Sequence, residues 1–358
     1  MQWIIRMPIS NMKLRDALVN AIAIHQPWTQ SRWKKLATDV DRFQHTHNPV
    51  LRRWRLSGGQ ALPISAFKEE MVSSFEPVRH HPWFESSGTT GAGGERVSRH
   101  HFPSLDLYRS SVIAGWSWQM RERNKDPKPR RFIGVMPSSQ EKPHSSLSCM
   151  VAILMKEFGD GEHFWAMQQG RWNWSGLQSH LRRLEKEGLS AVLFGTAFGW
   201  IHFLDWCAER KLQFRLPPDT LVFETGGYKG RSRELEPSEL HRQLARLLGL
   251  RLPQICSEYS MCELSSQAYS FRVQRKNRTH LVFRFPPWCH DRVTQPGSST
   301  PVAKGERGVL EIHDLANLDS CARIRTEDMA IDWEDGFELV GRLPQSGLKG
   351  CSLAFERS

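Results

Sequence analysis

Apolar and polar residues alternate along the chain in two different rhythms. Over residues 11–45 the apolar positions recur at helical spacing with charged residues between them, which predicts two amphipathic helices. Ser57-Gly58-Gly59 breaks this pattern, and helical spacing returns over residues 104–120. The N-terminal third therefore reads as mainly helical.

The middle of the chain carries short apolar runs of strand type, each bounded by residues that break regular structure. These runs cover residues 131–136, 190–194, 220–223 and 254–259. Helical stretches lie between them at 145–158, 176–187 and 237–249. Strands that alternate with helices predict an α/β fold, in which crossover helices cover a layered sheet.

Beyond about residue 270 the strand-type runs follow one another with turns between them. They cover residues 280–285, 308–313, 329–333 and 337–340, and they predict a β-rich subdomain. The expected division is a helical N-terminal segment packed on the core (1–80), an α/β core (81–270), the β-rich subdomain (271–342) and a short C-terminal tail (343–358).

Composition narrows the class of protein. The 358 residues include 14 Trp and 18 Phe, which excludes an intrinsically disordered chain. The net charge of +11 suits a polyanionic partner, but the Lys and Arg residues are scattered, which disfavours nucleic acid.

Cysteine usage and the N-terminus bear on the compartment. Seven Cys without a CxxC pair suit a reducing compartment. The N-terminus lacks the apolar core of a signal peptide, and the most apolar run, 191–206, is too short and interrupted to span a bilayer. We expect a soluble cytoplasmic protein.

One loop is rich in the residues that hold phosphate. It reads Ser86, Ser87, Gly88, Thr89, Thr90, Gly91. Glycines permit the backbone that points successive N–H groups at one anion, and the hydroxyls add neutral donors. The loop lacks the Gly-Lys-Ser/Thr ending of P-loop NTPases.

Four further segments follow this loop in order. They are Glu224-Thr225-Gly226-Gly227, Tyr259-Ser260-Met261-Cys262-Glu263, Arg325-Thr326-Glu327-Asp328 and Gly341-Arg342. Together the five segments resemble the ordered motifs of the adenylate-forming enzymes, which make an acyl-AMP from a carboxylic acid and ATP. The chain departs from the family pattern at Ser260 and Glu327, where the family has Gly, and at Cys262, where it usually has Thr.

The resemblance implies a role for each segment. The loop residues Ser86, Ser87, Gly88, Thr89, Thr90 and Gly91 would hold the β- and γ-phosphates of ATP. Glu263 would act as a catalytic residue that binds Mg²⁺. The other nucleotide-binding positions would be Gly226, Gly227 and Tyr259 at the adenine, Cys262 in the same segment as Tyr259, Asp328 at the ribose and Arg342 at the ribose or a phosphate.

Three more segments resemble a narrower family, the LuxE-type acyl-protein synthetases, or long-chain-fatty-acid luciferin-component ligases. They are Leu62-Pro63-Ile64-Ser65-Ala66-Phe67-Lys68, Phe285-Pro286-Pro287-Trp288 and Lys349-Gly350-Cys351-Ser352-Leu353. This likeness implies activation of a carboxylic acid of the fatty-acid class. The acyl group would then pass to Cys351 as a thioester and on to a partner protein, such as a reductase, a carrier protein or an acyltransferase. Only 16 residues follow Arg342, so the large C-terminal domain of the superfamily is expected to be missing.

Other interpretations stay open. A phenylacetate-type ligase would use CoA or a carrier protein as an external thiol and would not need Cys351. Changes at Ser260 and Cys262 leave room for a degenerate enzyme. A nucleic-acid-binding or scaffold protein would require the five ordered motifs to be coincidental. The apolar stretch from Phe194 to Trp200 suits an acyl channel, but a buried strand and helix start is the simpler interpretation.

Overall fold

The computed structural model describes residues 9–23, 27–86, 97–126, 130–226 and 235–343, with side chains from residue 13 onward. The chain forms two compact units. The first comprises Met1–Trp118, Met261–Gln267 and Val282–Ser358, and the second comprises Gln119–Ser260 and Ala268–Leu281. The four-segment division expected from the sequence stays a prediction.

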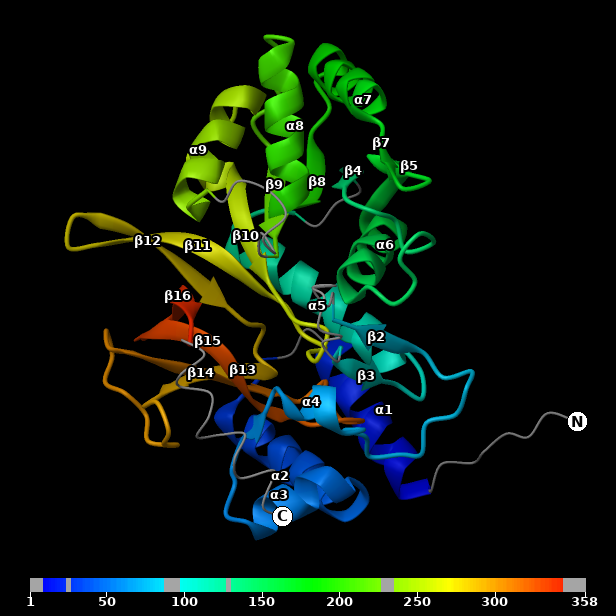
Figure 1. The fold of residues 1–358 in the computed structure, drawn as a ribbon, viewed down its shortest axis with the longest axis vertical. Helices are drawn as coiled ribbons and strands as arrows, with labels where there is room; N and C mark the ends of the chain where they lie inside the picture. The colour runs from blue at the N-terminus through cyan, green and yellow to red at the C-terminus, as the bar shows by residue number, and fades with distance from the viewer. Residues whose placement is uncertain (1–8, 24–26, 87–96, 127–129, 227–234, 344–358) are drawn as a thin grey trace, which may run out of the picture. The chain divides into compact units, whose positions relative to one another are not determined.

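The second unit is built on a mostly parallel sheet with the strand order β11-β10-β9-β8-β4-β5 (Figure 1). In chain order its strands are β4 (Arg130–Val135), β5 (Gly159–Trp165), β8 (Ala191–Thr196), β9 (Leu221–Thr225), β10 (Ile255–Tyr259) and β11 (Ala268–Arg275). Strands β4, β5, β8, β9 and β10 pair in parallel, and β11 is antiparallel to β10. The short strands β6 (Met167–Gln168) and β7 (Arg171–Trp172) form a separate hairpin.

Helices connect the parallel strands, as the alternating sequence pattern predicts. They are α6 (Ser146–Phe158), α7 (Trp174–Glu187), α8 (Ala197–Glu209), α9 (Pro237–Leu248) and the 3₁₀ turn η1 (Leu252–Gln254). Local sequence sets their ends. The Thr196 hydroxyl caps α8 by accepting from the N–H of Gly199, and Gly188 and Gly249 end α7 and α9 in the left-handed region.

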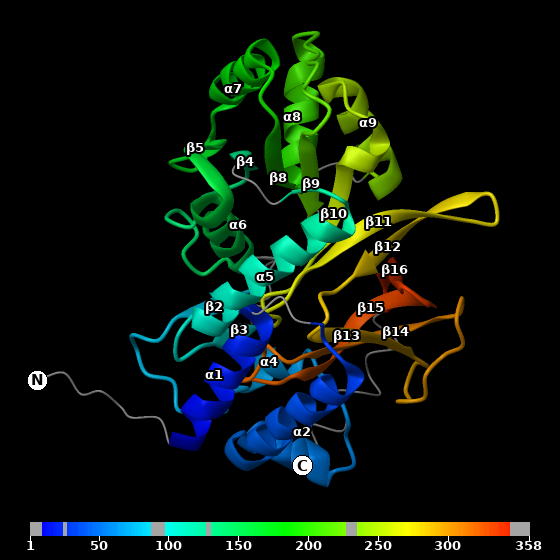
Figure 2. The same ribbon diagram turned by 180° about the vertical axis from the view of Figure 1, so that it is seen from behind.

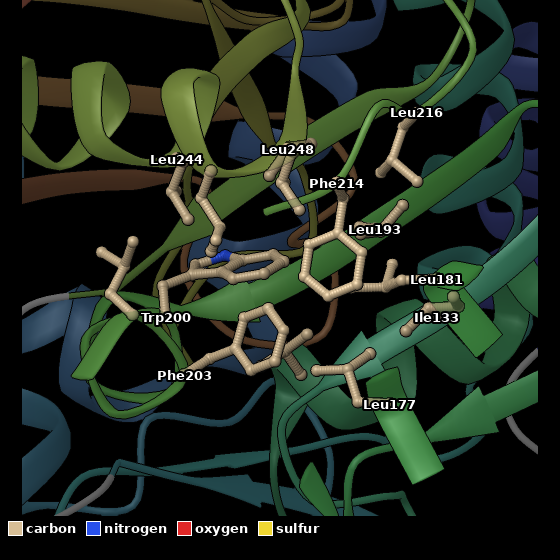
Figure 3. Packing of buried hydrophobic residues seen from close by; sticks show 14 of the residues in the cluster. Ile133, Leu177, Leu181, Leu193, Trp200, Phe203, Phe214, Leu216, Leu244 and Leu248 are labelled. Carbon is tan, nitrogen blue, oxygen red and sulfur yellow. The ribbon is translucent and has the colours of Figure 1, made fainter. Parts of the chain in front are cut away.

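One face of this sheet carries a large apolar cluster (Figure 3). Trp200 and Phe203 of α8 pack with Phe214 among leucines of α7 and α9, such as Leu181 and Leu244. Trp200 is fully buried, and its Nε1 donates to the carbonyl of Phe223 at 3.3 Å. The apolar stretch that ends in Trp200 is therefore a buried strand and helix start, as the simpler interpretation expected.

The first unit contains an antiparallel sheet in the order β13-β14-β15-β16-β12. Its strands are β12 (Arg278–Arg284), of which the residues from Val282 belong to this unit, β13 (Cys289–Thr294), β14 (Arg307–Asp314), β15 (Arg323–Trp333) and β16 (Gly336–Arg342). The short strand β1 (Leu62–Pro63) pairs in parallel with β15 at Ile324 and Arg325. The run over 289–294 was not predicted from the sequence, because polar and charged residues interrupt it.

The helices of the first unit are α1 (Ile9–Ala23), α2 (Gln30–His47), α3 (Pro49–Leu56), α4 (Ala66–Glu69) and α5 (Asp106–Glu122), the last of these through Trp118. Helices α1 and α2 correspond to the two amphipathic helices predicted over 11–45. Within the described part of the chain, no helix is long and apolar enough to cross a membrane.

Candidate nucleotide-binding site

The Ser/Thr/Gly loop starts from a two-stranded hairpin of the first unit, β2 (Trp83–Glu85) and β3 (Arg99–His101). Phe84 of β2 contacts Tyr108 of α5 with ring centroids 4.9 Å apart, and both views show the hairpin beside the start of α5 (Figures 1 and 2). At the base of the loop the Ser86 N–H donates to the carbonyl of Ser98, and the Ser98 N–H donates to Ser86 Oγ, both at 3.0 Å. These two bonds close the stem. Ser87, Gly88, Thr89, Thr90 and Gly91 lie outside the described residues.

A turn that carries Glu263 lies against this stem. His100 of β3 contacts the carbonyl oxygen of Cys262 through its Nδ1 at 3.0 Å. The sulfur of Cys262 lies 3.9 Å from the carbonyl oxygen of Ser98. The structure therefore brings Ser86, Cys262 and Glu263 into one region of the first unit, although 177 positions separate the two ends of this set in the sequence.

Buried side chains from the loop after β14 hold the Glu263 turn from its other side. Asn317 Nδ2 donates to the carbonyl of Glu263 at 2.7 Å. The carboxylate of Asp314 accepts from the N–H groups of Ser265 and Ser266 and from the Ser266 hydroxyl. Burial raises the pKa of Asp314 to about 6, and the donors around it oppose that shift.

Glu263 as a whole residue is 5% exposed. Its carboxylate oxygens are not among the buried polar atoms that lack a partner in the described part of the chain, whereas Glu258 Oε1 is one of them. Mg²⁺ in nucleotide sites uses one or two protein carboxylates and takes its other ligands from water and phosphate. Glu263, in the turn that contacts the loop stem, supplies one carboxylate of that kind. Among the described residues, no cluster of three or more His, Cys, Asp and Glu could hold a metal by itself.

The predicted ribose and hinge residues face each other in the same unit. Asp328 of β15 pairs in register with Arg342 of β16, and Arg342 Nε lies 3.4 Å from Asp328 Oδ1. The Arg342 side chain is 81% exposed, whereas that of Asp328 is 15% exposed. The Asp328 N–H donates to the hydroxyl of Thr326 at 3.0 Å, which fixes the backbone beneath the carboxylate.

The two predicted adenine positions that the structure describes belong to the second unit. Gly226 follows β9 directly, with φ +77 and open space where a Cβ would stand. Tyr259 is the last residue of β10, and the register pair Glu258↔Thr225 places β9 and β10 side by side at this end. Gly226 and Tyr259 therefore lie at the carboxyl edge of a parallel sheet, where ligands bind in open α/β folds. Gly227 and Cys351 lie outside the described residues.

Sequence reasoning missed one group at this edge. Glu258 is buried, its Oε2 accepts from the hydroxyl of Thr225, and its Oε1 has no partner among the described residues. Burial raises its pKa to about 7, against the hydrogen bonds from Thr225 and Ser260. A charged residue inside an otherwise buried parallel strand was the available signal.

A second missed set lies on the other face of the same strands. The Ser257 hydroxyl donates to Glu224 at 2.9 Å and lies 3.2 Å from His241 Nε2. Arg272 contacts Nδ1 of this histidine at 2.8 Å. These contacts join β9, β10, β11 and α9 directly beneath Gly226 and Tyr259.

Comparison with known proteins shows which proteins the chain resembles. No family model matches it. It is 26% identical over 309 residues to the long-chain-fatty-acid–luciferin-component ligase of Aliivibrio fischeri, a match that covers 82% of this chain and 76% of that protein. It is 22% identical over 189 residues to the ligase of the same name from Vibrio harveyi, which covers 50% of this chain and 48% of that protein.

Solved structures show the fold. An open conformation of 2-hydroxyisobutyryl-CoA ligase, in complex with 2-HIB-AMP and CoA, matches with a TM-score of 0.60 and 15% identity over 87% of this chain and 75% of that one. ATP-bound MatB from Rhodopseudomonas palustris matches with a TM-score of 0.51 and 16% identity over 73% and 47%. The α/β fold predicted from the sequence is confirmed, and β16 is the last element within residues 9–343. The chain is a distant homologue of the long-chain-fatty-acid–luciferin-component ligases, and its fold matches that of the acyl-CoA ligase bound to 2-HIB-AMP.

Proposed function

We propose that this chain uses ATP and Mg²⁺ to activate a fatty acid as acyl-AMP, and that it passes the acyl group to Cys351 and then to a partner protein. The observation that carries the activation step is the contact between the stem of the phosphate loop and the Glu263 turn. This contact sets the turn that carries Glu263 next to the base of a Ser/Thr/Gly loop.

Activation is an in-line displacement. A carboxylate oxygen of the acid attacks the α-phosphorus of ATP, the new P–O bond forms, and the bond to the β-phosphate oxygen breaks so that pyrophosphate leaves. Both reactants are anions, so the site must neutralise charge and fix their geometry. Bound Mg²⁺ would supply charge neutralisation at the phosphate oxygens. Glu263 would hold it, with the loop of Ser86 on the phosphates.

The remaining positions would bind the nucleoside. Asp328 offers two carboxylate oxygens to the two ribose hydroxyls, with Arg342 close enough to share the same group or a phosphate. Gly226 lets the backbone approach a flat base, and Tyr259 offers an aromatic ring at the same sheet edge.

The transfer step rests on the sequence around Cys351. Its thiolate attacks the carbonyl carbon of the acyl-AMP, a C–S bond forms, the C–O bond to phosphate breaks, and AMP leaves; the thiol proton passes to solvent. The described cysteines offer a contrast, because burial raises the pKa of the half-buried Cys149 to about 11 and keeps it a protonated, weak nucleophile.

The test is intact-protein mass and pyrophosphate release after incubation with ATP, Mg²⁺ and a panel of fatty and aromatic acids. We expect a hydroxylamine-labile acyl adduct on the native chain and on Cys149→Ser, its matched control, but none on Cys351→Ser. Pyrophosphate release should persist in both cysteine variants and should disappear in Glu263→Gln.

The other outcomes separate the alternatives. Pyrophosphate release without any adduct would overturn the role of Cys351, and would favour a ligase that passes the acyl group to CoA or a carrier thiol. Absence of both signals with every acid would contradict the activation step itself.

A further inference from the structure

His100 links the strand that follows the Ser/Thr/Gly loop in the sequence to the Glu263 turn. It lies on β3, in the strand that leaves the loop, and its side chain is fully buried. Nδ1 contacts the carbonyl oxygen of Cys262 at 3.0 Å, and Nε2 contacts the hydroxyl of Ser320 at 2.8 Å. Both ring nitrogens are therefore engaged, one on each side.

The partners fix the protonation of the ring. A carbonyl oxygen only accepts, so Nδ1 must carry a proton and donate it to Cys262. Burial lowers the pKa of His100 to about 3, so the ring is neutral near pH 7 and its Nε2 is an acceptor. The Ser320 hydroxyl must then donate to Nε2. The ring is held in one tautomer and one orientation.

The Glu263 turn needs this support because it lies in neither a helix nor a strand. Its local backbone bond is that from the N–H of Leu264 to the carbonyl of Met261, at 3.1 Å. Side chains from other segments bind two backbone carbonyls of the turn. His100 contacts the carbonyl of Cys262, and Asn317 donates to the carbonyl of Glu263. His100 differs from Asn317 in one respect, which is that it belongs to the strand that continues the phosphate loop.

We propose that His100 is a positioning residue, which couples the phosphate loop to the carboxylate of Glu263 through the Cys262 carbonyl. The proposal rests on the proposed function of these two elements. If the loop holds the phosphates and Glu263 holds their metal ion, the His100 bond keeps the two sets of ligands in register. Neighbours that orient metal ligands in this way change metal affinity by about 10–100-fold when they are replaced.

Two amide substitutions separate the two contacts of the ring. In His100→Asn the amide nitrogen stands near the position of Nδ1 and can still donate to the Cys262 carbonyl. In His100→Gln the amide reaches the position of Nε2 and keeps only the Ser320 contact. Each variant loses one buried hydrogen bond, so we expect similar losses of stability. Only the first variant keeps the link to Glu263.

The measurement is calorimetric titration of each protein with ATP, with and without Mg²⁺, and with AMP. We expect the gain in ATP affinity that Mg²⁺ confers to fall about 10-fold or more in His100→Gln and to stay near the native value in His100→Asn. AMP lacks the β- and γ-phosphates, so both variants should bind it with native affinity. Native AMP binding would also show that each variant is folded. His101→Gln, at the next position of the same strand, is the matched control and should behave as native.

A purely structural role predicts a different result. If Mg²⁺ raised the ATP affinity equally in the Asn and Gln variants, while the wild-type protein bound ATP and AMP, the positioning role of His100 would be overturned. The proposed function would still stand. Wild-type protein that bound neither ATP nor AMP would overturn the proposed function and this proposal together. If His100→Gln does not fold, His100→Ala takes its place. In His100→Ala the gain in ATP affinity from Mg²⁺ should be small, and added imidazole should restore that gain. If imidazole did not restore it, the proposal would be contradicted.

Discussion

Asp328 and Arg342 stand directly opposite each other on β15 and β16, with Arg342 Nε 3.4 Å from Asp328 Oδ1. The arginine is largely exposed and the aspartate is largely covered. Ion pairs with one exposed partner contribute about 0–1 kcal/mol to stability, because solvent screens them. The pair therefore contributes little to the stability of the fold, so the proposed ribose-binding role of Asp328 can be tested by substitution.

Substitution of Asp328 should weaken ATP binding and leave the stability of the fold nearly unchanged. In Asp328→Asn one of the two acceptor oxygens becomes an amide donor, so a ribose with two hydroxyls loses a hydrogen bond to a charged group. We expect the KM for ATP to rise about 10-fold, since such bonds contribute about 1.5–3 kcal/mol. Unfolding in urea should change by less than about 1 kcal/mol. Asp335→Asn, on the turn between the same two strands, should leave the KM unchanged; an equal rise there would contradict the ribose role.

Glu263 offers a prediction in which activity falls and stability holds. Glu263 is a buried residue, and Glu263→Gln keeps the size of its side chain while it removes one carboxylate oxygen as a metal ligand. We expect pyrophosphate release to fall about 100-fold or more, as for loss of a group that stabilises transition-state charge. The urea midpoint should hold, because the amide has the size and shape of the carboxylate. If pyrophosphate release and the urea midpoint fell together, Glu263 would have only a structural role. Glu306→Gln, at an exposed position, is the control for the loss of one acidic group.

Glu258 gives a pH prediction with a defined sign. Its pKa is raised to about 7 in the folded chain, so between about pH 4.5 and 7 the folded state binds more protons than the unfolded state. Stability from this group is therefore lost as pH rises through that window, at up to about 1.4 kcal/mol per pH unit. Urea unfolding of Glu258→Gln at pH 5 and pH 7.5 should show a flatter pH dependence than the native chain. An unchanged slope would show that the carboxyl is not titrating in the fold.

Trp200 should be essential to the second unit. It is fully buried in the apolar cluster, so Trp200→Ala should cost about 3–5 kcal/mol through lost burial and the cavity left behind. Denaturant unfolding followed by circular dichroism measures this. Trp206→Ala, at a half-exposed position of the same helix, should cost much less. A small cost at Trp200 would reopen the interpretation of this stretch as an acyl channel.

The local elements were predictable because their signals are local. The apolar spacing over 11–45 and the short buried runs at 190–194 and 254–259 lie within a few residues of one another, and they give α1, α2, β8 and β10. Strand β13 was missed because it reads Cys-His-Asp-Arg-Val-Thr, in which burial is decided by neighbouring strands and not by its own composition. The site residues of the five ordered motifs stay predictions, and the geometry now says which of them are neighbours.

The sequence by itself determined the α/β fold class, and it supplied five ordered segments that resemble those of enzymes that activate a carboxylic acid with ATP. Tertiary structure decided how the pieces of the site are held. His100 meets Cys262 across 162 positions, and Asp314 meets Ser266 across 48, through bonds that exist only after strands from distant segments pair. Burial likewise separates Glu258 and Glu263 from the chain's exposed glutamates, which have the same side chain. Local periodicity carries no record of such contacts, because they depend on which elements pack together.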